Sequence, residues 1–561
     1  MRVRSLLPRR EDAKADGAAG LTVGIASVPD GMAAAVLTGV NPIQGLYGAM
    51  AGSIVGGLTA RTQLMIVTTT SAGALAAGDA LSGLTGDERT GALALLLVLA
   101  GGLQIAAGLL RLGRFTGFVS HSVMKAFLLG IAVLIVLNQL PQLAGAEVEG
   151  DSAPERALDL VLHPGRIELG SLAAGLGALA LVLVLVRTPL RIVAALAAVA
   201  IPSLVVWALD SGVDVVGAVP GGLPTPKLPP LSAFSLDLLT GAAALAAIVL
   251  VQGAGVAESA PSPDLSPDAD FRAQGFANVA SGLVRGIPVG GSLGQTALNM
   301  SSGARTRWAS VATGLCIALV LLVFSDLVGY VVMPALAALL LLAAWSTIDV
   351  GEALSIWRTG TATKIIAAST FAATLFLPIQ AAVGLGVVLS ALLYLNQAAT
   401  DVKLVELVIR PDGRLEERSP PPVLPGDQVT ILDVYGSVFY AGARTLDERL
   451  PRPDGAERPV VVLRLRGHTK VGATFVEVLA RYSEELKQEG GRLYLAGVDP
   501  EARDLIVRTG KVSAAAAERI FPATPIVGES TEMAAAAGEA WLIEPSSASS
   551  PPGDEPAAAR D

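Results

Sequence analysis

The chain has few of the residues that build disulfides, metal centres or reactive sites. Its 561 residues include one cysteine, Cys316, and three histidines. One cysteine cannot form an internal disulfide, and this set is too small for a structural zinc cluster. We find no nucleophile beside a base and no cofactor motif, so an enzyme is the least expected class and no cofactor is expected.

Charge is also scarce. Only 16% of the residues are charged, and the net charge is -9, whereas an average soluble domain has about 25% charged residues. The acidic balance offers no basic surface for a phosphate backbone, so nucleic acid is not an expected partner. Apolar residues make up 52% of the chain, which excludes a disordered or ordinary soluble protein.

Apolar segments that are long enough to cross ~30 Å of hydrocarbon fill residues 17–400. We therefore predict an α-helical membrane domain at 17–400, after a cytoplasmic flank at 1–16 that shows no cleavage site. Fourteen transmembrane segments are predicted, at about 17–40, 43–60, 63–81, 90–110, 115–140, 168–187, 192–209, 237–257, 271–286, 289–303, 308–327, 329–347, 361–377 and 379–397.

The chain changes character after this domain. Residues 401–427 are charged and Pro-rich and are predicted to be a linker. Alternating strands and helices at 428–545 predict a small α/β domain, with a strand near 504–510 and a helix near 513–520. The end at 546–561 has the composition of a disordered tail.

The distribution of Lys and Arg predicts the orientation. Fourteen crossings with the N-terminus inside place most arginines in cytoplasmic loops and the acidic runs at 86–90, 147–155 and 210–214 outside. The acidic loop at 258–270 goes against this arrangement. Both termini and the α/β domain are thus expected in the cytoplasm, with the chain in a bacterial inner membrane and in contact with lipid.

Three predicted segments contain residues that interrupt helices. Pro29 and Asp30 lie in the first segment, the run VTTTSAG (67–73) opens the third, and IPVGGSLGQ (287–295) opens the tenth. Non-helical backbone survives at this depth only where protein or a water-filled cavity satisfies it. A helix that begins there directs unpaired N–H groups and its positive dipole end into the cavity, which suits an anion.

The spacing of these features indicates an internal repeat. Asp30 and Thr70 are 40 residues apart, as are Gln252 and Ser292. Asp30 and Gln252 are therefore separated by the same number of residues as Thr70 and Ser292. This constant offset relates the second pair to the first. Paired, interrupted segments of this kind are typical of a transporter's binding site.

Five stretches carry a family resemblance: SVPDGMAAA, NPIQGLYGAM (41–50), RFTGFVSHSVMKAFLLGIAVLIVLNQL (114–140), FANVASGL (276–283) and PVGGSLGQTALNMSSGARTR (288–307). They resemble motifs of the SulP sulfate permease family, and the soluble module resembles a STAS domain. The resemblance implies a seven-plus-seven inverted repeat with core and gate subdomains, a homodimer, and elevator-like alternating access. It also implies an anion site between the facing starts of segments 3 and 10.

The candidate site follows from these segments. Its predicted substrate-binding residues are Thr68, Thr69, Thr70, Ser71, Gly290, Gly291, Ser292, Leu293, Gln252 and Gln295. Each has a structural alternative: the hydroxyls can cap the half-helices, the glycines can allow close backbone approach, and the two glutamines can join helices by hydrogen bonds. His121 and Lys125 are expected to lie at the membrane interface.

The chain departs from the common SulP pattern at informative positions. Asp30 stands where many members carry Gln, Gln252 where they carry Glu, and Gln295 where they carry Arg. The STAS-like module has Gly472 about where regulatory relatives carry a phosphorylated Ser, which argues against that regulation.

These departures lead to a hypothesis of proton-coupled symport, with Asp30 as the proton carrier. A carboxyl in a low-dielectric site can bind a proton when the anion enters. Sodium bound at Asp30 is the neighbouring alternative; a passive channel, or an anion-gated sensor that signals through the STAS domain, is the alternative of another class. Sulfate, bicarbonate and dicarboxylates such as fumarate all remain candidate substrates.

Overall fold

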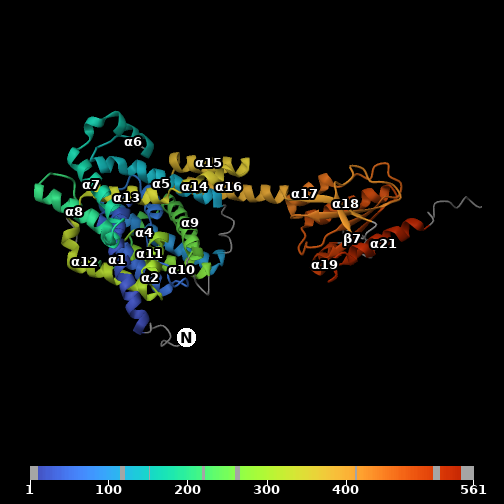
Figure 1. Ribbon diagram of the computed structural model, residues 1–561, viewed down its shortest axis with the longest axis horizontal. Helices are drawn as coiled ribbons and strands as arrows, with labels where there is room; N and C mark the ends of the chain where they lie inside the picture. The colour runs from blue at the N-terminus through green and yellow to red at the C-terminus, as the bar shows by residue number, and fades with distance from the viewer. Residues whose placement is uncertain are drawn as a thin grey trace, which may run out of the picture. The chain divides into compact units, whose positions relative to one another are not determined.

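The computed structural model describes residues 10–113, 121–150, 152–217, 222–259, 266–410, 414–509 and 519–544 (Figure 1). The chain divides into two compact units, Met1–Ala391 and Leu392–Asp561, and the boundary falls within one helix. The predicted tail at 546–561 and most of the helix predicted near 513–520 lie outside the described residues, as do parts of the predicted flank and of the acidic loop at 258–270.

The first unit is helical. Its helices are α1 (Arg10–Thr38), α2 (Pro42–Thr59), α3 (Ser71–Ala80), α4 (Gly86–Leu109), α5 (His121–Ala144), α6 (Ala153–Leu162), α7 (Leu169–Leu185), α8 (Ala194–Leu209), α9 (Leu236–Ser259), α10 (Pro267–Leu283), α11 (Leu293–Ser301), α12 (Trp308–Val328), α13 (Met333–Thr347), α14 (Val350–Trp357), α15 (Thr361–Phe376) and α16 (Ile379–Thr400). Two short strands, β1 (Val67–Thr69) and β2 (Val289–Gly291), directly precede α3 and α11.

The helices pack as two bundles. The first, here called the half-helix bundle, comprises α1–α4 and α9–α12, in which α10 packs on α4 and α2, α12 packs on α1 and α2, and α3 packs on α1 and α9. The second, here called the flanking bundle, comprises α5–α8 and α13–α16. In it α5 packs on α13, α15 and α7, and α16 is grouped with them because its Gly386 lies against Val123 of α5 and Thr370 of α15. Contacts of α1 with α13 and α8, and of α3 with α5, join the two. A continuous apolar core therefore runs through both bundles.

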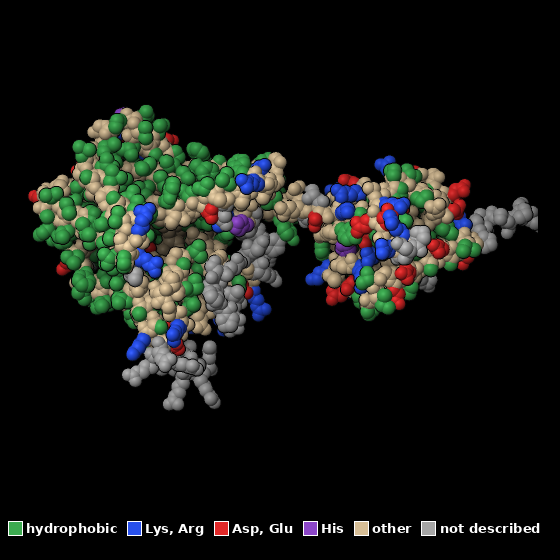
Figure 2. Space-filling view, in the orientation of Figure 1, with side chains coloured by type: hydrophobic (Ala, Val, Ile, Leu, Met, Phe, Trp, Pro, Cys, Tyr) green, Lys and Arg blue, Asp and Glu red, His purple; other side chains and the backbone are tan. Residues whose placement is uncertain are grey.

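Six described helices are long and apolar enough to cross a membrane: α1, α4, α5, α9, α12 and α16. The apolar helices α7, α8, α13 and α15 are shorter. Within the described residues, each of the fourteen predicted segments overlaps a helix, and segments 3 and 10 coincide with a strand followed by a short helix. Residues 115–120 of the fifth predicted segment lie outside the described residues. Hydrophobic side chains cover much of the visible surface of this unit (Figure 2).

Two expectations at the start of the chain differ from the structure. The predicted flank is not separate from the first segment, because α1 begins at Arg10 and the buried Asp16 accepts hydrogen bonds from the backbone N–H groups of Arg305 and Thr306. The predicted interruption at Pro29 is absent, since α1 continues through it to Thr38. The surrounding bundle supports a helix whose proline removes only one intrahelical bond.

The second unit is an α/β domain. Its six-stranded sheet has the order β4-β3-β5-β6-β7-β8, with β3 antiparallel to both β4 and β5 and the remaining pairs parallel. The strands are β3 (Lys403–Ile409), β4 (Leu415–Arg418), β5 (Val429–Tyr435), β6 (Val460–Arg464), β7 (Arg492–Val498) and β8 (Ile520–Pro522). The helices are α17 (Tyr440–Arg449), α18 (Ala473–Gln488), α19 (Pro500–Arg508) and α21 (Glu529–Ile543).

This unit corrects two sequence predictions. Residues 403–409 and 415–418, predicted as linker, form β3 and β4, because β3 buries Leu404 on one face of the sheet and Val405 and Leu407 on the other. Residues 504–508 of the strand predicted near 504–510 are instead the end of α19. That helix starts at Pro500, and its N-cap Asp499 accepts a hydrogen bond from Glu501 N.

Candidate anion site

Two half-helices begin next to each other in the middle of the half-helix bundle. Thr70 is the N-cap of α3, and its Oγ1 accepts a hydrogen bond from Gly73 N at 3.2 Å. Ser292 is the N-cap of α11, and its Oγ accepts from Gln295 N at 3.4 Å. The structure thus begins both helices where the sequence predicted, at positions related by the constant sequence offset. Each leaves first-turn N–H groups available at its N-terminal end.

The strands that lead into these helices pair antiparallel. Thr68 is opposite Gly290, Val67 opposite Gly291, and Thr69 opposite Val289. The offset that relates Thr70 to Ser292 also relates Thr68 to Gly290. Thr68 therefore pairs with the residue that corresponds to it at this offset. Val67 corresponds to Val289 and Thr69 to Gly291, but each pairs with the residue that corresponds to the other. A two-fold axis that passes between Thr68 and Gly290 produces this pattern of pairs.

Two buried amides of α10 hold the outer edge of β2. The Oδ1 of Asn278 accepts from Val289 N at 3.0 Å, while its Nδ2 donates to Val289 O at 2.7 Å. The Oε1 of Gln274 accepts from Gly291 N at 3.1 Å. Asn278 thereby replaces a neighbouring strand for Val289. Sequence reasoning missed both amides, although Asn278 lies within FANVASGL (276–283) and Gln274 two residues before it.

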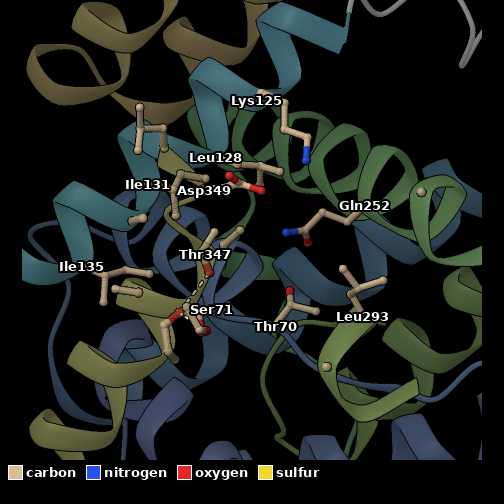
Figure 3. A pocket seen from close by; sticks show the side chains of 18 of the residues that line it. Thr70, Ser71, Lys125, Leu128, Ile131, Ile135, Gln252, Leu293, Thr347 and Asp349 are labelled. Atoms are coloured by element: carbon tan, nitrogen blue, oxygen red, sulfur yellow. Dashed lines mark hydrogen bonds between the residues drawn. The ribbon is translucent and has the colours of Figure 1, made fainter. Parts of the chain in front are cut away.

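A cavity of about 1130 Å³ adjoins the half-helix starts and extends between the two bundles. Figure 3 shows Thr70, Gln252 and Leu293 on one side of it and Ile131 and Ile135 of α5 on the other. All the predicted site residues line it except Gly290: Asp30, Thr68, Thr69, Thr70, Ser71, Gln252, Gly291, Ser292, Leu293 and Gln295.

Gly290 has a packing role instead. A Cβ at this position would lie 2.8 Å from Val249 Cγ1 of α9, so the glycine allows β2 to approach that helix. The close backbone approach predicted at Gly290 is therefore an approach to α9 of the protein itself. His121 and Lys125, expected at the interface, also line the cavity, together with Asp349 and Lys364.

Asp30 projects from α1 into the cavity, where its side chain is exposed. Its Oδ2 accepts a hydrogen bond from Gln295 Nε2 at 2.5 Å. The repeat counterpart of Asp30 is Gln252, and the counterpart of Gln295 is Gly73, which has no side chain to offer. Gln252 therefore lacks the partner that Asp30 has.

Several polar atoms around the cavity are buried and make no hydrogen bond within the described part of the chain. They are Ser27 Oγ, Thr68 Oγ1, Gln252 Oε1 and Gln295 Oε1. A buried polar atom without a partner is costly, and an isolated case needs an explanation. The two hydroxyls can donate to an anion, whereas the two amide oxygens can only accept, from water or from a protonated group. Next to two half-helix starts, these atoms indicate a polar ligand site in which N–H and O–H donors supply the attraction for an anion.

Comparison with known proteins decides the family. The sequence model of the sulfate permease family matches residues 14–370, and that of the STAS domain matches residues 422–523. The chain belongs to the sulfate permease family. This is a family of transporters rather than enzymes, and the second unit is its STAS domain.

Curated relatives include a probable sulfate transporter of Mycobacterium tuberculosis, 32% identical over 69% of this chain and 71% of the relative. A putative sulfate transporter of Bacillus subtilis is 25% identical over 88% of this chain and 93% of the relative.

Solved structures share the fold. The overall structure of SLC26A9 has a TM-score of 0.82 at 17% identity and covers 95% of this chain and 92% of that chain. The transmembrane domain of a cyanobacterial bicarbonate transporter, BicA, has a TM-score of 0.59 at 22% identity and covers 67% of this chain and 99% of that chain. The chain is therefore an anion transporter of this family with the fold of the SLC26 proteins.

Proposed function

We propose that this protein is a secondary transporter that takes up a small anion together with a proton. The observation that carries the proposal is the meeting of two half-helix N-termini at one cavity that also contains a carboxyl group, that of Asp30. Helix N-termini attract anions through their N–H groups and dipoles. A passive channel has no need of a protonatable group at this place.

Asp30 is the proposed proton carrier. The family's frequent arginine is replaced by Gln295, so backbone N–H groups and hydroxyls must provide most of the attraction for the anion. An ionised Asp30 beside the anion opposes binding, whereas a protonated Asp30 does not. The proton enters the carboxyl from the more acidic side and leaves it on the other side. Gln295 suits both forms, because its Nε2 donates to the carboxylate and its Oε1 is available to a protonated acid.

The remaining parts of the proposal concern architecture. We infer fourteen crossings arranged as a seven-plus-seven inverted repeat, with both termini in the cytoplasm of a bacterial inner membrane and two copies in a homodimer. The half-helix bundle acts as the moving core and the flanking bundle as the gate. The exchange of counterparts in the β1–β2 pairing supports the inverted repeat. The named relatives make sulfate and bicarbonate the first substrates to test, followed by fumarate.

The test is uptake of labelled sulfate, bicarbonate and fumarate into proteoliposomes with an inward proton gradient. We expect at least one anion to accumulate, and accumulation to stop when the gradient is removed. Asp30→Asn should abolish the dependence on the proton gradient. Asp87→Asn is the matched control, because Asp87 is an exposed carboxylate in the first turn of α4 and does not line the cavity.

Other outcomes separate the alternatives. Accumulation driven by a sodium gradient and lost in Asp30→Asn would assign the carboxylate to sodium. Flux without accumulation, unchanged in Asp30→Asn, would indicate a channel. Unchanged proton dependence in Asp30→Asn would end the case for this residue as the carrier.

A further inference from the structure

Asp79 makes a hydrogen bond to a helix that is distant in sequence. It lies in the last turn of α3, and its Oδ2 accepts from the backbone N–H of Ile379 at 2.9 Å. Ile379 is the first residue of α16, whose opening N–H groups have no partner within the helix. A carboxylate at a helix N-terminus is stabilised by that N–H and by the helix dipole.

This bond joins the two bundles. α3 packs on α1 and α9 of the half-helix bundle. In α16, Gly386 lies against Val123 of α5 and Thr370 of α15, all in the flanking bundle. α16 is otherwise sparsely packed, with one buried stripe along its described length: Ile379, Ala382, Gly386, Ser390 and Leu393.

Arg89 lies at the same end of α3 as Asp79, but its hydrogen bonds stay within the half-helix bundle. Its guanidinium donates to the carbonyl oxygens of Thr38, Gly78, Leu81 and Leu84. These residues all belong to α1, α3 and the turn before α4. Arg89 therefore fastens the half-helix bundle to itself, whereas Asp79 connects it to the flanking bundle.

The Asp79 bond lies away from the open part of the cavity. The cavity is lined by Ser71 and Ala72 at the start of α3 but neither by Asp79 nor by any residue of α16. Asp79 lies eight residues after Ser71, a distance of about 12 Å along the helix axis. The cavity extends instead toward His121 and Lys364. The bond between Asp79 and Ile379 therefore joins the two bundles at the C-terminal end of α3, whereas the N-terminal end of α3 faces the cavity.

We propose that Asp79 is a positioning residue that holds the half-helix α3 against α16 in the conformation described here and so sets the balance between the two access states. This rests on the proposed function in one respect, that the bundles move relative to each other. When α3 moves with the core, the bond to Ile379 must break. Its loss therefore favours the opposite state.

The test uses two cysteine reporters in a Cys316→Ser background, in lipid nanodiscs where a maleimide reaches both faces. Thr347→Cys reports on the open cavity, which Thr347 lines. Gln380→Cys reports on the closed end, where Gln380 Nε2 lies next to Gly241 of α9. We expect Asp79→Ala to raise labelling of Gln380→Cys about tenfold, as fits the loss of a hydrogen bond to a charged group. Labelling of Thr347→Cys should fall at the same time.

Asp79→Asn is the matched variant, because its side-chain oxygen still accepts the Ile379 N–H. Its labelling rates should stay within about twofold of the parent. A rise at Gln380→Cys without a fall at Thr347→Cys would mean local fraying of α16 and would overturn the proposal, as would unchanged rates in Asp79→Ala. If both reporters react rapidly in the parent itself, alternating access fails instead, and the fault then lies with the proposed function.

Discussion

The two arms of the site, β1–α3 and β2–α11, have the same backbone design but are held in the bundle by different means. Each arm is a three-residue strand, a hydroxyl N-cap and a short helix. The edge of β2 is held by two side-chain amides of α10: Asn278 accepts from Val289 N and donates to Val289 O, and Gln274 accepts from Gly291 N. The counterparts of these amides in α2 are Gly52 and Gly56.

Those glycines hold β1 by close packing. A Cβ at Gly56 would lie 2.4 Å from Val67 Cβ, and one at Gly52 would lie 3.0 Å from Val67 O. Close helix approach through small residues is common within membranes. The two arms thus share one shape, while the specific bonds that hold them differ. We infer that the β2–α11 arm is held rigidly by directional bonds, and that the β1–α3 arm depends on packing and on Asp79.

The largest difference between the arms should appear when their edge contacts are removed. Asn278→Ala leaves the N–H and C=O of Val289 buried without partners, so it should lower the free energy of unfolding by about 3 kcal/mol. Ser53→Ala removes a 3.4 Å bond to Val67 O at the edge of β1 and should cost under about 1 kcal/mol. Thermal unfolding of the purified variants measures both. Equal losses would contradict the distinction between the arms.

A smaller effect is expected at the paired residues on the proposed axis. Gly290→Ala places a Cβ 2.8 Å from Val249 Cγ1 and should destabilise by about 1–3 kcal/mol. Adding Val249→Ala removes the opposing atom, so the double variant should lose less than the sum of the single losses. Thr68→Ala removes a buried hydroxyl that has no hydrogen-bond partner among the described residues, so it should leave stability unchanged while weakening anion uptake. Strict additivity of the Gly290 and Val249 variants would show that the contact is not the cause.

Local residue types were sufficient to predict where the helices of the two arms begin. Thr70 and Ser292 are hydroxyl residues ahead of short helical runs, and the constant sequence offset identified them as corresponding residues. The same reasoning failed for Asn278. Its partners are the backbone groups of Val289 in β2, and no sequence pattern indicates that β2 packs against α10. It also failed for Arg89, which stands in an acidic run predicted as an outside loop but binds four carbonyl oxygens at helix ends.

The second unit gives the same result on a smaller scale. The sheet was predicted from its alternating strands and helices, but β3 and β4 were missed because a Pro-rich stretch directly follows them. In α19 the start signal was present as Asp499 and Pro500, and the apolar residues after it resembled a strand of equal length. In both cases the type of element depended on what it packs against.

The smallest predicted difference concerns the two N-caps. Thr70→Ala and Ser292→Ala each remove one cap and should each cost about 1 kcal/mol of stability. Their effects on transport should nevertheless differ. Ser292 binds the backbone N–H of Gln295, the residue that holds Asp30, so Ser292→Ala should change the dependence of uptake on the proton gradient. Thr70→Ala should change only the apparent anion affinity, because Gly73 has no side chain that reaches Gln252. Ser292→Thr, which keeps the hydroxyl, should restore the parent's proton dependence, and identical transport behaviour of the two alanine variants would show that the arms are equivalent in coupling.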